Sequence, residues 1–217
     1  MAIEANTGLS GAGSSSASSG VTRSTWADFP AASSVAAGTV RMASDYNNSE
    51  WVSDGTYWKP RGGRQRPFVM AAAVSSTGTI SEVNAWAPTI PAGMLFPMCN
   101  VEVGATITKT GTAGTTTLRQ RYNGAAGTIV GHNSSASSAS VGGVSISRLA
   151  AGVASGGNIT LTQGNNSNSA NGIAFNVIPS VSVTHTMASA VTLNLTLHAS
   201  SAADTINITN AFMEICG

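Results

Sequence analysis

The stretch Val35–Gly63, VAAGTVRMASDYNNSEWVSDGTYWKPRGG, combines a turn signal with a dense group of aromatic residues. Ser53–Thr56 (SDGT) predicts a tight turn between two short strands, because Asp and Gly tolerate the dihedral angles that such turns require. Upstream, Gly38–Ala43 alternates apolar with polar side chains, which predicts a third strand. A basic Gly/Pro run beginning at Lys59 ends the stretch. These signals predict a small aromatic β-unit.

On its N-terminal side the stretch is preceded by two segments of different character. Residues 1–20 end in LSGAGSSSASSG, and such a composition buries too little apolar surface to offset the entropy of ordering the chain. We therefore expect residues 1–20 to be a flexible tether. Val21–Pro30 then brings back aromatic residues, Trp26 and Phe29, so the aromatic β-unit is expected to span residues 21–67.

On its C-terminal side, residues 68–217 show strand signals with turn residues between them. In Asn100–Thr110 (NVEVGATITKT), four apolar side chains alternate with Glu102, Gly104, Thr106 and Thr108. Short strands and no amphipathic helix predict an all-β fold, with residues 68–217 forming an antiparallel β-sandwich or jelly-roll-like head. Further strands are expected at Phe68–Val74, Thr115–Tyr122, Val144–Leu149, Asn158–Gln163, Ile173–Ile178, Val181–Thr186, Val191–His198 and Thr205–Ile215, with a loop at Trp86–Gly93.

The chain is poor in charge, which bears on its partners. Charged residues make up 9% of the 217 residues, against about 25% in ordinary soluble domains. Such a surface is poorly protected against association, so we expect a homo-oligomer. A net charge of +1 gives no field that would attract nucleic acid. The N-terminal residues do not resemble a signal peptide, and no apolar run approaches about 18 residues, so we expect no membrane insertion.

Two parts of the chain resemble tailed-bacteriophage virion appendage proteins. Gly38–Gly63 contains SDGTYWKP and resembles the SDG-x-x-W-x-P element near the N-termini of phage tail-fibre, head-fibre and receptor-binding proteins. Thr205–Ile215 resembles the closing strand of the jelly-roll heads on phage fibres. The resemblance implies a homotrimer in the virion, attached to other virion proteins through its N-terminal region. Anchoring or subunit contact is then expected of Trp26, Phe29, Trp51, Tyr57 and Trp58.

The residues that usually carry catalysis or bind metals are few and scattered. A glycosidase needs paired carboxylates, and after Phe68 the only acids are Glu82, Glu102, Asp204 and Glu214. No metal-binding or phosphate-loop spacing is present, although His185 and His198 flank a predicted hairpin. Cys99 and Cys216 lie in apolar contexts and are expected to be free thiols. We therefore expect no enzymatic activity, no metal and no cofactor.

Binding residues are suggested by two features. The polar loops Asn133–Ser140 and Gly164–Gly172 are rich in amides and hydroxyls, which could bind a host-surface glycan. The candidates there are Tyr122, Asn133, Asn165, Asn166, Asn168 and Asn171. The basic run Lys59–Arg66 is either a phosphate- or nucleic-acid-binding patch, or a solvated linker or a contact to a partner protein. The second interpretation is favoured because the run lacks interleaved aromatic residues.

These observations together predict a structural component of a phage particle, a fibre or spike involved in host attachment. The alternative is a capsid decoration or head-fibre protein that stabilises or ornaments the shell. A glycan-degrading tailspike is a third reading, which the scattered acids disfavour. Composition does not separate the first two, because both combine an anchoring region with a β head.

Overall fold

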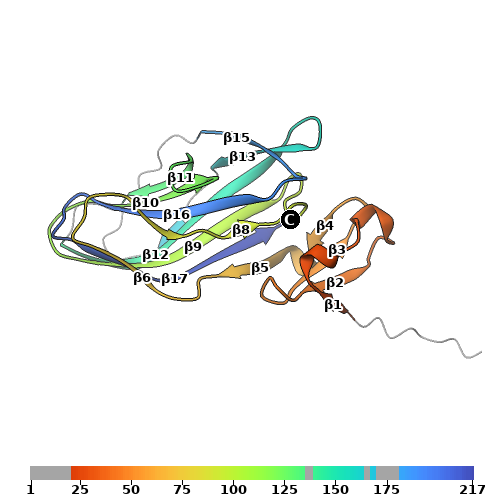
Figure 1. The fold of residues 1–217 in the computed structure, drawn as a ribbon, viewed down its shortest axis with the longest axis horizontal. Coiled ribbons are helices and arrows are strands. Elements are labelled where there is room, and N and C mark those ends of the chain that lie inside the picture. Colours follow the sequence, from red (N-terminus) through yellow and green to blue (C-terminus); the bar gives the residue numbers. More distant parts are fainter. Residues whose placement is uncertain (1–20, 135–138, 164–166, 170–180) are drawn as a thin grey trace, which may run out of the picture.

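The computed structural model describes residues 21–134, 139–163, 167–169 and 181–217, and within these ranges it is all-β. Apart from three short 3₁₀ turns, every regular element there is a strand. The strands form a small sheet and two larger sheets that pack as a sandwich (Figure 1). The all-β sandwich expected from the sequence is thus confirmed, whereas the trimer stays a prediction. No helix in the described ranges is long and apolar enough to cross a membrane.

The small sheet is the β-unit, and it contains β1 (Thr22–Ser24), β2 (Val40–Ala43), β3 (Ser49–Ser53) and β4 (Trp58–Pro60) in that spatial order. β2, β3 and β4 are antiparallel neighbours, while β1 pairs with β2 in parallel. The turn expected at SDGT closes the β3–β4 hairpin. The backbone N–H of Asp54 donates to the Tyr57 carbonyl at 3.1 Å, and Gly55 has φ +92°.

The larger sheet of the sandwich has the order β15-β13-β12-β9-β17-β5, with β14 beside β12 and β6 beside β17. Every strand pair in it is antiparallel. Its strands are β5 (Arg64–Val69), β6 (Val74–Thr77), β9 (Asn100–Thr110), β12 (Ser140–Val153), β13 (Asn158–Gln163), β14 (Ser167–Ser169), β15 (Val183–Thr186) and β17 (Thr205–Cys216).

The second sheet of the sandwich is also antiparallel and has the order β11-β10-β16-β7, with β8 beside β16. Its strands are β7 (Val83–Trp86), β8 (Thr89–Ile90), β10 (Thr116–Tyr122), β11 (Thr128–Ser134) and β16 (Val191–Ala199).

The core of the sandwich follows the two-residue period of its strands. In β9 the side chains of Val101, Val103, Ala105 and Ile107 are all buried, as their alternation predicts. In the facing sheet, every second residue of the middle of β16 is a buried leucine: Leu193, Leu195 and Leu197. Burial of such apolar side chains supplies the main stabilising term of the fold.

Strand β5 joins the β-unit to the sandwich. β5 begins at Arg64 and pairs with β17 of the sandwich, so the boundary expected after residue 67 falls inside a strand. The β-unit lies at one end of the sandwich, close to the C-terminus (Figure 1). There the N–H of Gly217 donates to the carbonyl of Gly63 at 3.0 Å. The C-terminal strand therefore ends against the segment that joins the two parts.

Two expected segments differ from the structure. Phe68–Val74 is not one strand, because β5 ends at Val69 and β6 begins at Val74. Trp86–Gly93 is not wholly a loop, since Thr89–Ile90 pairs with β16 despite the flanking prolines. The strand expected at Ile173–Ile178 lies outside the described residues.

Candidate functional site

Four aromatic rings form a continuous cluster in the β-unit. Trp26 comes from a 3₁₀ turn, Phe29 follows that turn, and Trp51 and Trp58 project from β3 and β4. The ring centroids lie 4.9 Å apart for Trp26 and Phe29, 5.0 Å for Trp26 and Trp51, and 5.1 Å for Phe29 and Trp58. Their tilted and edge-on orientations are those that aromatic quadrupoles favour. The cluster is the apolar core of a unit whose strands are only three to five residues long.

The indole N–H groups of this cluster are satisfied inside the protein. Trp26 Nε1 donates to the carbonyl of Ala92 at 3.0 Å, which ties the β-unit to a loop of the sandwich. Trp58 Nε1 donates to the carbonyl of Pro30 at 2.9 Å. The backbone N–H of Trp26 donates to Asp45 Oδ1 at 2.9 Å. These hydrogen bonds fix the orientation of the rings and of the junction between the two parts of the chain.

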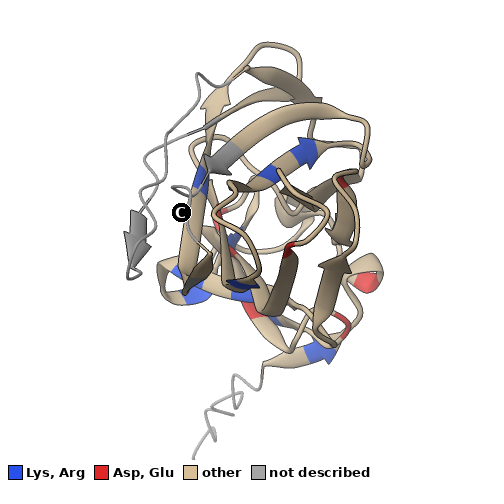
Figure 2. Cartoon of the chain, turned by 90° about the vertical axis from the view of Figure 1, so that its left-hand side faces the viewer, with Lys and Arg blue, Asp and Glu red and all other residues tan. Residues whose placement is uncertain are grey.

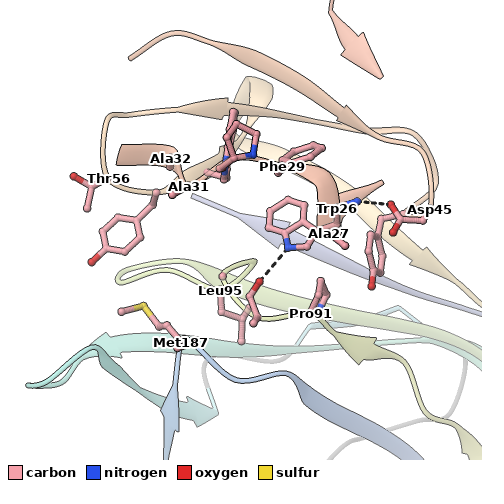
Figure 3. Close-up of a pocket in the computed structure, with 17 residues that line it drawn as sticks. Trp26, Ala27, Phe29, Ala31, Ala32, Asp45, Thr56, Pro91, Leu95 and Met187 are labelled. Atoms are coloured by element: carbon pink, nitrogen blue, oxygen red, sulfur yellow. Dashed lines mark hydrogen bonds between the residues drawn. The ribbon is translucent and has the colours of Figure 1, made fainter. Parts of the chain in front are cut away.

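A cavity of about 570 Å³ lies at this junction (Figure 3). The aromatic side chains of the β-unit line one side of it, and a sandwich surface that includes Pro91, Leu95 and Met187 lines the other. Its volume falls in the range of about 300–1,000 Å³ that small-ligand sites occupy. Because it borders both parts of the chain, the cavity depends on how the β-unit docks on the sandwich.

The cavity lining is mostly apolar and carries one negative charge. Asp45 is the charged member of the lining, which contains no Lys, Arg or His. Burial and the neighbouring Asp45 carboxylate raise the pKa of Tyr46, so its phenol stays protonated at neutral pH. The lining therefore offers aromatic faces, hydroxyl groups and one carboxylate, but no basic group for an anionic ligand.

The first half of the basic run is paired within the β-unit. Lys59 Nζ lies 2.8 Å from Asp54 Oδ2, and Arg61 Nη1 lies 2.8 Å from Glu50 Oε2. Both pairs are solvent-exposed, and exposed pairs contribute little to stability. Neither basic side chain is left without a carboxylate, which lowers the positive potential that a phosphate group would require.

The second half of the basic run is paired on the outer face of the larger sheet. Arg64 Nη1 and Arg66 Nη2 lie 2.8 and 2.6 Å from the two oxygens of Glu214 on β17. Glu102 on β9 is the direct cross-strand neighbour of Glu214, and it accepts a 2.7 Å hydrogen bond from Arg148 Nε on β12. Three arginines thus hold two adjacent buried carboxylates, on a molecule whose charges are otherwise sparse (Figure 2). The basic side chains of the run are therefore paired with carboxylates of the same chain, and a contact to a partner protein stays a prediction.

The residues expected to anchor the protein divide into two groups in the structure. Trp51 is completely buried, and Trp26 and Trp58 are nearly so, because they form the core of the β-unit. Phe29 and Tyr57 are only partly buried and line the cavity. Anchoring through the side chain of Trp51 would require the unit to open, so a contact role stays a prediction mainly for Phe29 and Tyr57.

Three of the expected glycan-binding residues lie in the described part of the chain, and each of them belongs to a strand. Tyr122 is the last residue of β10, and its hydroxyl lies 3.1 Å from Nδ1 of the buried His185. Asn133 lies in β11 and Asn168 in β14, so neither belongs to a loop. The structure therefore assigns Tyr122 a hydrogen bond toward the interior rather than an open stacking platform. Asn165, Asn166 and Asn171 lie outside the described residues.

Sequence reasoning missed a charged cluster on the outer face of the smaller sandwich sheet. Glu82 accepts hydrogen bonds from Arg119 Nη1 at 2.7 Å and from Arg121 Nε and Nη2 at 2.7 and 2.6 Å, and also from the hydroxyl of Thr196. Burial alone would raise the pKa of Glu82, but these hydrogen bonds outweigh it and lower the pKa to about 2. The sequence did contain one signal for this cluster, namely that Arg119 and Arg121 lie on one face of a predicted strand. Glu82 precedes β7, and only the fold brings it to them.

A second missed feature is a buried ion pair. Lys109 and Asp204 have side chains with no exposed surface, and Lys109 Nζ lies 3.3 Å from Asp204 Oδ2. Lys109 Nζ also donates to the carbonyls of Thr112 and Gly114, at 2.8 and 2.6 Å. Asp204 Oδ1 accepts from the N–H and the hydroxyl of Thr112, at 2.7 and 2.8 Å. This pair closes the β9–β10 turn against the start of β17.

The histidines and cysteines do not form a metal site in the described part of the chain. His185 lies on β15 and His198 on β16, which belong to different sheets, and burial lowers the pKa of His185. Cys99 and Cys216 are free thiols, and burial raises the pKa of Cys99 to about 11. Among the described residues no group of three or more His, Cys, Asp or Glu side chains could hold a metal ion.

No protein-family model matches the sequence, and no curated protein matches it. Two solved structures are similar to the chain at a low level. One is an alginate lyase from Alteromonas sp. 272, with a TM-score of 0.26 and 12% identity. The other is aly-SJ02, a polysaccharide lyase of family 18, with a TM-score of 0.25 and 11% identity. Each comparison covers 69% of this chain and 90% of the other.

These two similarities correct one expectation. Both similar structures are polysaccharide lyases, so the prediction that this chain has no enzymatic activity is contradicted and is withdrawn. The physical reason for that prediction was that the chain lacks paired carboxylates. Glycoside hydrolysis requires such a pair, but the pair is no criterion for other reactions on polysaccharides. At such TM-scores and identities, the similarity assigns neither a reaction nor a residue to this chain.

Proposed function

We propose that the protein is a structural component of a phage particle, a homotrimeric fibre or spike involved in host attachment. Its place would be the virion, with other virion proteins as partners of the N-terminal region. The proposal is supported by the SDG-x-x-W-x-P element, which here is the β3–β4 hairpin of a separate small unit. That unit sits at one end of a larger β-sandwich, so the two ends of the molecule can serve different partners.

The single observation that carries the proposal is this division into an N-terminal aromatic unit and a β-sandwich. The aromatic cluster of the β-unit belongs to one hydrophobic core that continues into the sandwich, and the unit is also attached by the Trp26–Ala92 hydrogen bond and by β5. A unit at one end of the molecule can bind one partner while the far end of the sandwich faces another. The low charge of the chain supports burial of part of its surface in an assembly.

The test is the position of the protein on intact particles, imaged with a label at its N-terminus. Density at the tail is the expected result, with few copies per particle. Density spread over the shell, with many copies, would instead make the protein a capsid decoration or head-fibre protein. Absence from particles would refute both. The trimer is tested separately by light scattering of the purified chain, which should give three times the 21.7 kDa chain mass.

A further inference from the structure

The junction cavity combines an apolar lining with a few polar groups that make no hydrogen bond within the described part of the chain. Its hydrophobic surface comes from the aromatic cluster and from Leu95 and Met187. Oδ1 of Asp45 and the indole N–H of Trp26 are already engaged, with the Trp26 backbone and with the Ala92 carbonyl. Figure 3 shows both hydrogen bonds within the lining. The polar atoms that hold the two parts of the chain together are therefore unavailable to a ligand.

Four other polar groups of the lining have no hydrogen-bond partner among the described residues. They are Oδ2 of Asp45, the hydroxyl of Thr56, and the phenols of Tyr46 and Tyr57. Thr56 and Asp45 lie at opposite ends of the lining in Figure 3, with the side chain of Trp26 between them. A ligand that fills the cavity would thus meet aromatic surface in the middle and hydrogen-bonding groups at both ends.

The charge of the lining restricts the chemistry of the ligand. One carboxylate and no basic group disfavour an anionic ligand such as a uronate or a phosphate. A purely apolar ligand would leave the carboxylate and hydroxyls without partners. A neutral pyranose sugar fits both constraints, because its C–H face packs on aromatic rings while its ring hydroxyls donate to a carboxylate and exchange hydrogen bonds with phenols.

We propose that the junction cavity binds a neutral oligosaccharide, with Tyr57 packing against a sugar ring and Asp45 accepting from its hydroxyls. This inference deepens, and rests on, the proposed role in host attachment. It places glycan binding at the border between the β-unit and the sandwich, and not at Tyr122 and the polar loops expected from the sequence. It assigns the exposed part of Tyr57 to glycan binding in place of the anchoring contact expected of that residue.

The test uses the purified full-length chain on an array of neutral and anionic glycans, with solution titrations of the bound neutral glycans. Trp26 and Trp58 line the cavity, so their fluorescence reports binding directly. Tyr57→Ala should weaken binding about tenfold through the lost aromatic contact. Asp45→Asn keeps an acceptor for the Trp26 N–H and should weaken binding about fivefold, because a charged acceptor is replaced by a neutral one.

Tyr122→Ala is the matched control, since it removes the same kind of side chain from the sandwich and should leave binding unchanged. Circular dichroism and thermal unfolding test whether each variant folds. If Tyr57→Ala does not fold, the affinity of Asp45→Asn alone tests the proposed site. Binding to no glycan, binding to anionic glycans only, or equal affinity of wild type and Asp45→Asn would overturn the inference.

The same variants separate this inference from the proposed function. If wild type and both cavity variants adsorb equally well to host cells, attachment stands and the cavity is not its glycan site. If the chain binds neutral glycans through Tyr57 but is absent from phage particles, the cavity site stands and the virion role falls.

Discussion

The buried pair Lys109–Asp204 allows a sharp test of the electrostatics in this weakly charged protein. Lys109→Met keeps most of the apolar stem but removes the ammonium group that lies 3.3 Å from Asp204. The carboxylate would then remain buried with only its two hydrogen bonds from Thr112. Removing one partner of a buried ion pair usually costs about 3–5 kcal/mol, because the other charge is left uncompensated.

That loss is a large fraction of the total stability of a typical domain, which is about 5–15 kcal/mol. For a chain of this length it corresponds to a fall in Tm of about 6–20 °C. The assay is urea and thermal unfolding at neutral pH, followed by circular dichroism. Lys59→Met is the control, because the Lys59 side chain is 43% exposed in its pair with Asp54 and should contribute less than about 1 kcal/mol.

The double variant Lys109→Met/Asp204→Asn should be less destabilised than the sum of the two single variants, since neither charge is then left alone. Burial acts to raise the pKa of Asp204, but the hydrogen bonds from Thr112 and Lys109 outweigh it and the pKa is lowered. The stabilisation is therefore complete above the ordinary pKa and disappears as the pH falls through the folded-state pKa. Equal effects of Lys109→Met and Lys59→Met, or strict additivity in the double variant, would refute this reasoning.

Three further results are expected. Because the pKa of Glu82 is lowered from 4.5 to about 2, unfolding free energy should fall by up to about 3 kcal/mol between pH 4.5 and pH 2, and Glu82→Gln should flatten this profile in urea titrations. Gly104→Ala would place a Cβ 2.3 Å from the ring of Phe212, so urea unfolding should show a loss of about 1–3 kcal/mol; unchanged stability would mean that the ring moves freely. Trp26→Phe removes the hydrogen bond to Ala92 and should lower stability by about 1 kcal/mol while speeding proteolysis between the β-unit and the sandwich, and unchanged cleavage would show that other contacts hold the junction.

The fold could be predicted to a large extent because strand formation leaves a local pattern. β9 and β13 begin and end where the alternation in the sequence places them. The SDGT turn was recognisable because Asp54 and Gly55 meet its conformational needs within four residues. Weak or interrupted patterns were less informative, as the two-residue strand Thr89–Ile90 shows.

The candidate site was only partly predictable. The aromatic residues of Val21–Gly63 were singled out, but as contacts to other molecules, whereas three of the tryptophans are the unit's own core. Whether an aromatic side chain packs inward or stays exposed depends on how β3, β4 and the 3₁₀ turn at Trp26 fold over one another. The sequence pattern does not contain that information.

The sequence by itself determined the all-β class, the β3–β4 hairpin and the alternation that builds the sandwich core, since each depends on neighbours a few residues apart. Only the tertiary structure decided which charges meet and where the cavity lies. Asp204 reaches Lys109, and Glu82 reaches Arg121, across separations of many residues that only the strand order bridges. The cavity lies where the β-unit meets the sandwich, beside the hydrogen bond from Trp26 to Ala92, and contacts between such distant segments leave no local pattern in the chain.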